Sequence, residues 1–439
     1  MTTLRLLALC GLLAACAGDL TDAPGGGSPD LARAAADPTV GTVAPDNAPR
    51  DTTLDVQVLG TGYDQGSRVD LALAGVLDPT NVRTNSTRYV SSKELVANIT
   101  ISLAATLARY DVVVTTSKGK KGIGTERFLV FTEVLAAPSG GATVSDVSPT
   151  ALISGSISTS CGPGFAPALW DQAGQLTQLP ALAGTCGGVA RAVNSGGTSV
   201  GSAYVGSSMA ASVRWTPGSG GYAVDQLPLL PDGTEPGAWD INDLGQVGGG
   251  NAAAVWTQAT GWQLLIKPVG ATLCVATQIN NSGQMTARCT IGGQPRGAFW
   301  ATVSADPVLL PLPTGATGTS PWGINASGTI AGYIQSGGVN RAARWVPAGA
   351  TWTPEILGDL GSGGSAHGLN DAGQVIGAVN ATSGGYVRPA YWEPSGALHL
   401  LESSTLLGEA VGVSQVSGGL VIAGYVRTKG TKVAVRWRP

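Results

Sequence analysis

Tryptophan returns at a nearly constant interval along the last two-thirds of the chain. Seven tryptophans follow one another at spacings of 41 to 47 residues: Trp170, Trp215, Trp256, Trp300, Trp345, Trp392 and Trp437. The residues between them alternate apolar and small polar side chains and are interrupted by Gly and Pro, which is typical of short strands. A period of about 45 residues built only from strands is the spacing of a propeller blade. We therefore predict an all-β chain in which residues 131–439 form a seven-bladed β-propeller.

A second repeated string lies upstream of the tryptophans. INDLGQVGG (241–249), INNSGQMTA (279–287), INASGTIAG (324–332) and LNDAGQVIG (369–377) share an apolar residue, Asn, two spacers and Gly. Asn favours the first position of a turn and Gly accepts a positive φ, so the string predicts a tight hairpin. The turn position is filled by Asn194, Asn242, Asn280, Asn325 and Asn370, and by Ser148 and Ser414 in the first and last copies. No DxDxDG-type loop surrounds Asp243 or Asp371, so these turns are not predicted to bind calcium.

The repeat unit, above all LGDLGSGGSAHGLNDAGQVIG (357–377), resembles the HAF family of extracellular repeats, and the resemblance extends over all seven copies. Each unit contains four predicted strands, but nothing after Trp437 can supply the fourth strand of the last unit. TEVLAAP (132–138), just before the first unit, looks like every other fourth strand. We predict that it pairs beside the third strand of the last unit and so closes the ring, which removes the exposed edges.

Residues 38–130 have a different pattern. TLDVQVLGTGY, RVDLALAG, ELVANITISL and YDVVVTT alternate with period two at the spacing of a β-sandwich. The segment resembles the IPT/TIG family of immunoglobulin-like domains through PTV (38–40), GTGY (60–63), YDVVV (110–114) and RFLV (127–130). The resemblance implies an Ig-like β-sandwich that serves as a spacer or binding module.

The first 37 residues contain targeting signals. MTTLRLLALCGLLAA (1–15) has one Arg and then an apolar run too short to span a bilayer. The step from Leu13-Ala14-Ala15 to Cys16 resembles the lipobox of bacterial lipoproteins, which implies cleavage before Cys16 and lipidation of that residue. The alternative is an ordinary secretory signal cut elsewhere. Residues 16–37 are predicted to be a flexible tether, and Ala17 after the cysteine implies sorting to the outer membrane of a cell envelope.

Four further cysteines remain after removal of residues 1–15: Cys161, Cys186, Cys274 and Cys289. An even set in an exported chain predicts two disulfides. Folding the hairpin about Asn280–Gly283 brings Cys274 opposite Cys289, or one residue from it. Cys161 and Cys186 fall in loops on one face of the predicted propeller and form the second expected pair.

Composition and motifs exclude several functions. Only 12% of residues are charged and the net charge is −3, so there is no basic footprint for nucleic acid. The sequence contains no nucleophile elbow, HExxH, phosphate loop or His–carboxylate pair, so no catalytic residue, metal or cofactor is predicted. A glycosidase needs two converging carboxylates. Asp240 with Glu355 or Glu393 are candidates, but nothing in the sequence brings them together.

Candidate ligand-binding residues occupy one slot, three positions before the turn Asn. The slot holds Trp239, Trp322 and His367, and Arg191 and Thr277 in other copies. Period two puts it on the strand face of the apolar residue before each Asn, which favours packing against the neighbouring unit over binding. We expect any ligand on the face opposite the Asn turns, where loop length varies.

These patterns predict a monomeric cell-envelope lipoprotein, anchored to the membrane by its lipid, that acts in surface binding, display or adhesion with a glycan or protein ligand. The alternative is a propeller hydrolase or lyase acting on extracellular polysaccharide. A carbohydrate-binding lectin is a narrower form of the first function. Converging carboxylates in the channel would favour the enzyme, and an exposed aromatic platform would favour the lectin.

Overall fold

The computed structural model describes residues 36–50, 52–102, 105–106, 108–131, 133–138, 141–160, 164–206, 208–381, 387–401, 407–417, 419–428 and 431–439. The predicted signal peptide, the lipidation site at Cys16, most of the tether, and Cys161 lie outside the described residues. In the described part of the chain all regular secondary structure is β, in agreement with the predicted all-β class. None of the described segments forms a helix that could span a bilayer.

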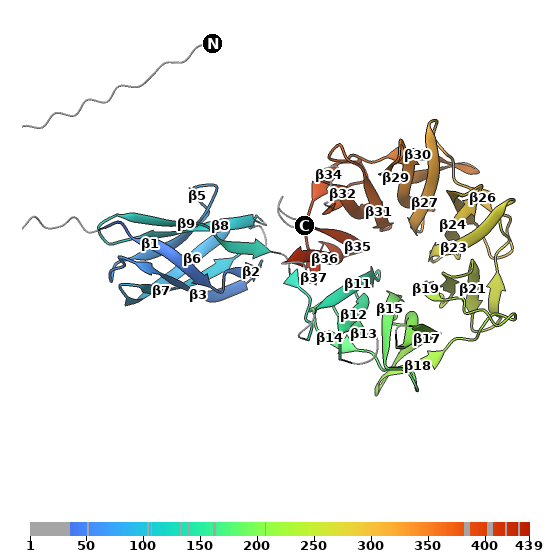
Figure 1. Ribbon diagram of the computed structural model, residues 1–439, viewed down its shortest axis with the longest axis horizontal. Helices are drawn as coiled ribbons and strands as arrows, with labels where there is room; N and C mark the ends of the chain where they lie inside the picture. Colours follow the sequence, from blue (N-terminus) through green and yellow to red (C-terminus); the bar gives the residue numbers. More distant parts are fainter. Residues whose placement is uncertain are drawn as a thin grey trace, which may run out of the picture.

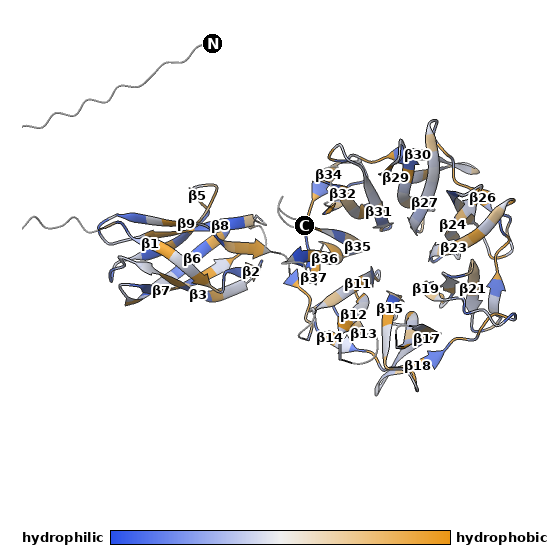
Figure 2. Ribbon diagram, in the orientation of Figure 1, coloured by the Kyte–Doolittle hydropathy of each residue, from blue (hydrophilic) through white to orange (hydrophobic). Residues whose placement is uncertain are grey.

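The N-terminal part consists of two sheets, of strand order β1-β3-β7-β6 and β2-β9-β8-β4-β5. Its strands are β1 (Thr39–Ala44), β2 (Asn47–Pro49), β3 (Thr52–Thr61), β4 (Arg68–Leu73), β5 (Val76–Leu77), β6 (Val82–Ser91), β7 (Glu94–Ile101), β8 (Ala108–Thr115) and β9 (Lys121–Phe131). Burial alternates along β7, so that Leu95 and Ile99 of one sheet share a core with Val114 and Phe128 of the other. The same strands therefore carry both hydrophobic and hydrophilic colours in Figure 2.

The rest of the chain forms a ring, in which the described residues make seven four-stranded antiparallel sheets (Figure 1). We number these ring sheets 1 to 7 in the order of their innermost strands. The innermost strands are β11 (Ala142–Val147), β15 (Gly187–Val193), β19 (Ala238–Ile241), β23 (Ala271–Ile279), β27 (Ala316–Ile324), β31 (Gly364–Leu369) and β35 (Leu407–Val416). The second strands are β12 (Ile153–Ser158), β16 (Ser199–Val205), β20 (Val247–Gly249), β24 (Met285–Ile291), β28 (Ile330–Ser336), β32 (Val375–Asn380) and β36 (Gly419–Thr428).

The third strands end at or just beyond the repeated tryptophans. They are β13 (Phe165–Trp170), β17 (Ser208–Gly218), β21 (Ala254–Thr257), β25 (Gln294–Trp300), β29 (Val339–Ala348), β33 (Val387–Trp392) and β37 (Thr431–Trp437). The outermost strands are β14 (Leu176–Gln178), β18 (Gly221–Gln226), β22 (Gly261–Leu264), β26 (Val308–Leu309), β30 (Thr351–Ile356) and β34 (Leu398–Leu400), with β10 (Glu133–Val134) in ring sheet 7.

Five of the repeated tryptophans fasten their sheet to the sheet before it. Trp300, for example, is fully buried, and its Nε1 donates to the carbonyl of Ile266, just beyond the outermost strand of the preceding sheet, at 2.9 Å. The same bond recurs from Trp170 to Ala136, Trp215 to Pro180, Trp345 to Pro311 and Trp392 to Gly358. In ring sheet 3 the bond is made by Trp262 to Pro228. A tryptophan N–H therefore bonds the preceding sheet from each of ring sheets 1 to 6, and in five of these the donor is the repeated tryptophan.

The repeated asparagines close their own hairpins, and four of them also fasten their sheet to the next. Asn280 Oδ1 accepts the N–H groups of Ser282 and Gln284, both at 3.0 Å, and Gly283 has the positive φ that the sequence predicts. Asn280 Nδ2 donates to the carbonyl of Asn325 in the next sheet at 2.9 Å. The carbonyl bond to the next turn recurs from Asn194, Asn242 and Asn325. Ser414, at the same position of ring sheet 7, instead bonds the carbonyl of Pro149.

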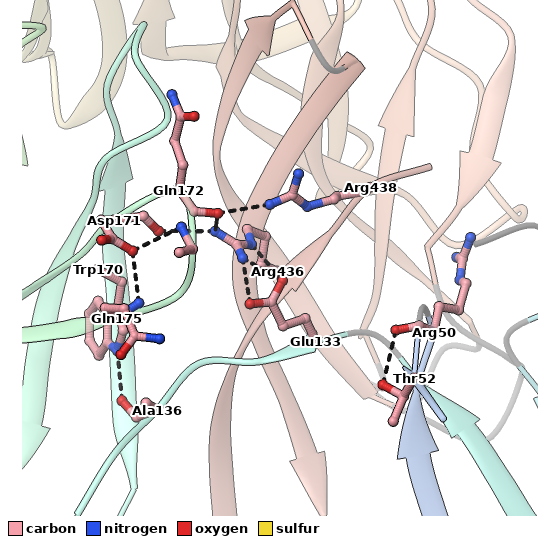
Figure 3. Close-up of polar contacts among 11 residues, drawn as sticks. Arg50, Thr52, Glu133, Ala136, Trp170, Asp171, Gln172, Gln175, Arg436 and Arg438 are labelled. Atoms are coloured by element: carbon pink, nitrogen blue, oxygen red, sulfur yellow. Dashed lines mark hydrogen bonds and ion pairs between the residues drawn. The ribbon is translucent and has the colours of Figure 1, made fainter. Parts of the chain in front are cut away.

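Ring sheet 7 is assembled from both ends of the repeat region, as the sequence predicts. β10 pairs with β37, placing Glu133 opposite Arg436. The Arg436 side chain is 2% exposed, and its Nε donates to Glu133 Oε2 at 2.8 Å. Its Nη1 donates to the carbonyls of Asp171 and Gln172 in ring sheet 1, so one guanidinium joins three segments (Figure 3).

The predicted disulfide between Cys274 and Cys289 is present, and the two residues are direct cross-strand partners in ring sheet 4. A register shift between Ala276 and Gln278 brings them into line, because Ile279 pairs with Met285 at the hairpin end. Cys186 is also disulfide-bonded. Since Cys161 lies outside the described residues, the pairing of Cys161 with Cys186 stays a prediction.

Candidate ligand site in the central channel

Two cavities lie on the axis of the ring and share part of their lining. One, of about 330 Å³, is lined by the Asn turns and is called here the turn-end cavity. The other, of about 470 Å³, is lined by the opposite halves of the innermost strands and is called the loop-end cavity. Both are lined by Asp146, Val147, Asp240, Gln278, Leu369 and Val413. These shared residues form a waist between the two ends of one channel.

A bulge in every innermost strand supplies the side chains of the loop-end cavity. The register of each strand shifts at the residue three positions before the turn Asn or Ser, for example between Ala238 and Asp240 or between Ala366 and Gly368. A bulged residue has no direct partner in the ladder, and the local bend re-aims its side chain. The bulged residues are Ser145, Arg191, Trp239, Thr277, Trp322, His367 and Val411, and all of them line the loop-end cavity.

The three candidate residues from the sequence thus occur at one cavity, and each is partly buried. Trp239 packs closely against Gly250, and the Arg191 guanidinium lies 5.0 Å from its ring centroid. Trp322 Nε1 is buried and has no hydrogen-bond partner among the described residues. His367 Nδ1 lies 3.0 Å from the carbonyl of Ala410 in the next sheet. Residues at this position therefore both pack against neighbouring groups and line the cavity. The sequence favoured packing because each innermost strand was treated as regular, without the bulge at this position.

Two carboxyl groups occupy the waist. Asp146 Oδ2 accepts the N–H of Val193 at 3.3 Å, and Asp240 Oδ2 accepts the N–H of Ile279 at 2.7 Å, in each case from the next sheet. Burial raises the pKa of Asp146 to about 6. Burial, and then the charge of Asp146, raise the pKa of Asp240 to about 7. The pair can therefore hold a proton near neutral pH.

Sequence reasoning proposed Asp240 but missed Asp146, although both stand two residues before the turn residue of their sheet. The proposed partners of Asp240 lie elsewhere. Glu355 Oε2 is 2.7 Å from Arg344 Nε on neighbouring outer strands, and Glu393 Oε1 is 3.0 Å from His399 Nε2. Neither glutamate lines the channel cavities. No group of three or more His, Cys, Asp or Glu side chains in the described ranges is placed to hold a metal.

The acidic residues of the turns are engaged in the scaffold. Asp243 Oδ1 accepts the N–H of Ser195 at 2.7 Å, and its Oδ2 accepts from the Ser195 hydroxyl and from Asn281 Nδ2. Asp371 Oδ1 accepts the N–H of Ala326 at 2.8 Å. Each carboxylate therefore links its turn to that of a neighbouring sheet.

No protein-family model and no curated protein matches the chain. Among solved structures, virginiamycin B lyase from Staphylococcus aureus matches 69% of this chain and 97% of its own, at 12% identity and a TM-score of 0.43. The intramolecular trans-sialidase from Ruminococcus gnavus matches 92% of this chain and 94% of its own, at 10% identity and a TM-score of 0.29. Similarity at this level says nothing about binding or activity.

Proposed function

We propose that this chain is a cell-envelope lipoprotein whose ring is a seven-bladed β-propeller that binds a glycan in the loop-end cavity. One observation carries the proposal. The bulged residues of all seven innermost strands, which differ in chemistry from sheet to sheet, point to one cavity of about 470 Å³. Pockets for small ligands are typically 300–1,000 Å³ and combine apolar walls with a few polar groups.

The composition of the cavity favours a glycan over a folded protein. Trp239 and Trp322 bring indoles, and Arg191, Thr277 and His367 bring polar groups. A sugar ring has an apolar face and a hydroxyl rim that suit such a mixture. A stable protein interface needs about 800 Å² on each partner, which a concave cavity of this size does not offer.

The remaining parts fit a display role. The N-terminal sheets around one core support an Ig-like domain of IPT/TIG type, which would hold the ring away from the membrane. Lipidation at Cys16 and an outer-membrane location follow from the lipobox resemblance. Mass spectrometry of the N-terminus tests this part, because an unacylated end at another residue would contradict it. We further propose that the protein is a monomer.

A hydrolase or lyase is the second candidate function, and the waist is the observation that favours it. Asp146 and Asp240 are two interacting carboxyl groups with raised pKa values in a channel. One protonated and one ionised carboxyl is the pair that glycoside hydrolysis needs.

A glycan-array screen of the purified full-length protein tests both functions. We expect a defined set of oligosaccharides to bind, and binding to be lost in Trp322→Ala while Leu264→Ala, a substitution of an exposed apolar residue on the outermost strand β22, retains it. Loss of binding only on changing Asp243 or Asp371 would show that the glycan binds at the turn end of the channel, which would contradict the proposed site. Incubation with the bound oligosaccharides should leave them intact, and the appearance of new reducing or unsaturated ends would favour the enzyme.

A further inference from the structure

We propose that the glycan bound in the loop-end cavity carries free amino groups, and that its ammonium group is held by Asp146 and Asp240 at the waist and by His367 on the adjoining wall of the loop-end cavity. This inference rests on the proposed function and adds the class of sugar to it. Three features carry it: the hydrogen-bonding state of His367, the remaining acceptor positions of the two waist carboxyl groups, and the charge of the lining.

His367 presents an acceptor when it is neutral. The carbonyl oxygen of Ala410 can only accept, so the Nδ1 atom 3.0 Å away must carry the hydrogen. In a neutral imidazole the other nitrogen then has a free lone pair. Nε2 of His367 is therefore an acceptor on a residue that lines the cavity.

The two waist carboxyl groups also have acceptor capacity to spare. An ionised carboxylate offers about four lone-pair positions. Asp146 accepts the N–H groups of Val193 and Val147, and Asp240 accepts those of Ile279 and Ile241, so about two positions on each carboxylate stay open. Ala192, the residue at this position of the sheet between them, contributes only a methyl group. A ligand with several donors on one charged nitrogen satisfies such a set of acceptors better than a neutral sugar does.

The titratable groups around the loop-end cavity are predominantly acidic. They are Asp146, Asp240, Glu409, Arg191 and His367. Arg191 already has partners within the protein: its Nε donates to Ser202 at 3.3 Å, and its guanidinium lies over the Trp239 ring. The turn-end cavity adds Asp243 and Asp371 on the other side of the waist. A bound cation therefore meets an excess of negative charge, and the nearby indoles add a cation–π component.

The proposal predicts a specific dependence on pH. Burial raises the pKa values of Asp146 to about 6 and Asp240 to about 7, so acid protonates both and removes the charges that hold the ligand. Alkali removes the proton from the amino sugar. Affinity should therefore pass through a maximum near neutral pH, and binding should release protons from the carboxyl groups.

The test compares two matched oligosaccharides by calorimetry on the full-length protein at neutral pH: a glucosamine tetramer and its fully N-acetylated counterpart. We expect the amino form to bind at least tenfold more tightly. Asp240→Asn and Asp146→Asn should each remove at least tenfold of that affinity, whereas Asp225→Asn, the same change on an outermost strand, should not. Asn keeps an oxygen that can accept the N–H of the next sheet, and thermal melting checks that each variant is folded.

The outcomes separate this inference from the proposed function. Equal affinity for the two tetramers would overturn the ammonium inference and leave glycan binding intact. Binding of neither tetramer would also overturn it, and the glycan array would then decide the proposed function separately. Tight binding of the amino form that persists in both Asn variants would place the ammonium group away from the waist.

Discussion

The two ends of the central channel are built from the same seven strands but use their polar groups differently. At the turn end, the residue at the turn is Asn in five sheets and Ser in two, and its side chain is spent on its own hairpin and on neighbouring turns. At the loop end, three residues earlier, the bulged positions of the seven sheets hold six different residue types, and only Trp occurs twice. The turn residue is nearly constant because its side chain must bond its own hairpin and the neighbouring turns. The bulged residue varies because it has no direct partner in the ladder. A binding site is expected at the second end.

The largest predicted effect is at the turn end. Asn280→Ala removes four hydrogen bonds of a side chain that is 6% exposed, two to its own turn N–H groups and one each to Gln284 and Asn325. At about 1 kcal/mol for each of the four bonds, we expect the free energy of unfolding to fall by about 4 kcal/mol. Chemical denaturation measures it.

Thr277→Ala, in the same strand at the loop end, is the matched control. Thr277 makes one side-chain hydrogen bond, to the Thr286 hydroxyl at 2.9 Å. We expect a loss of about 1 kcal/mol or less. If the two substitutions lower the free energy of unfolding by the same amount, the turn end contributes no more to the stability of the ring than the loop end does, and the contrast drawn between the two ends is wrong.

The parts of this fold that could be predicted from the sequence are those that local chemistry dictates. The Asn-x-x-Gly hairpin, the Cys274–Cys289 pair and the closing strand at Glu133 each follow from turn geometry or from the repeat. The bulges could not be read from the repeat, because a one-residue shift changes register without changing the pattern of residues. Nor could the approach of Asp146 to Asp240, which depends on how ring sheets 1 and 3 face the axis.

The next effect concerns the cost of charge at the waist. Asp240 is 8% exposed, and burial raises its pKa to about 7, far above the value of about 4 expected in the unfolded chain. Between these values the folded protein holds a proton that the unfolded chain has released, so stability falls as pH rises from about 4 to about 7.

Asp240→Asn should therefore stabilise the protein at pH 8, where the wild-type carboxyl is ionised. Each unit of pKa corresponds to about 1.4 kcal/mol, so the shift of about three units corresponds to about 4 kcal/mol. Asn has one acceptor oxygen where Asp240 uses its carboxylate for the N–H groups of both Ile279 and Ile241, and the lost hydrogen bond offsets about 2 kcal/mol of this. A net gain on the order of 2 kcal/mol is therefore expected at pH 8, with no gain at pH 4. Melting curves at the two pH values measure it. A loss of stability at pH 8 would mean that the charged carboxylate fastens the ring as the turn-end asparagines do, and the waist would then belong to the scaffold.

The smallest predicted effect is at Trp322, on the wall of the loop-end cavity. Its indole N–H is buried without a partner among the described residues, which costs about 1–3 kcal/mol. Trp322→Phe removes that unpaired donor but also some apolar contact, so the two changes should nearly cancel, leaving stability within about 1 kcal/mol of wild type. Trp345→Phe is the contrasting variant, because the Trp345 Nε1 bonds the carbonyl of Pro311 across a seam between sheets, and its removal leaves that carbonyl unpaired. Denaturation of both variants should show the larger loss for Trp345. If Trp322→Phe lowers the free energy of unfolding as much as Trp345→Phe does, Trp322 serves packing. The bulged residues would then have less support as a binding surface.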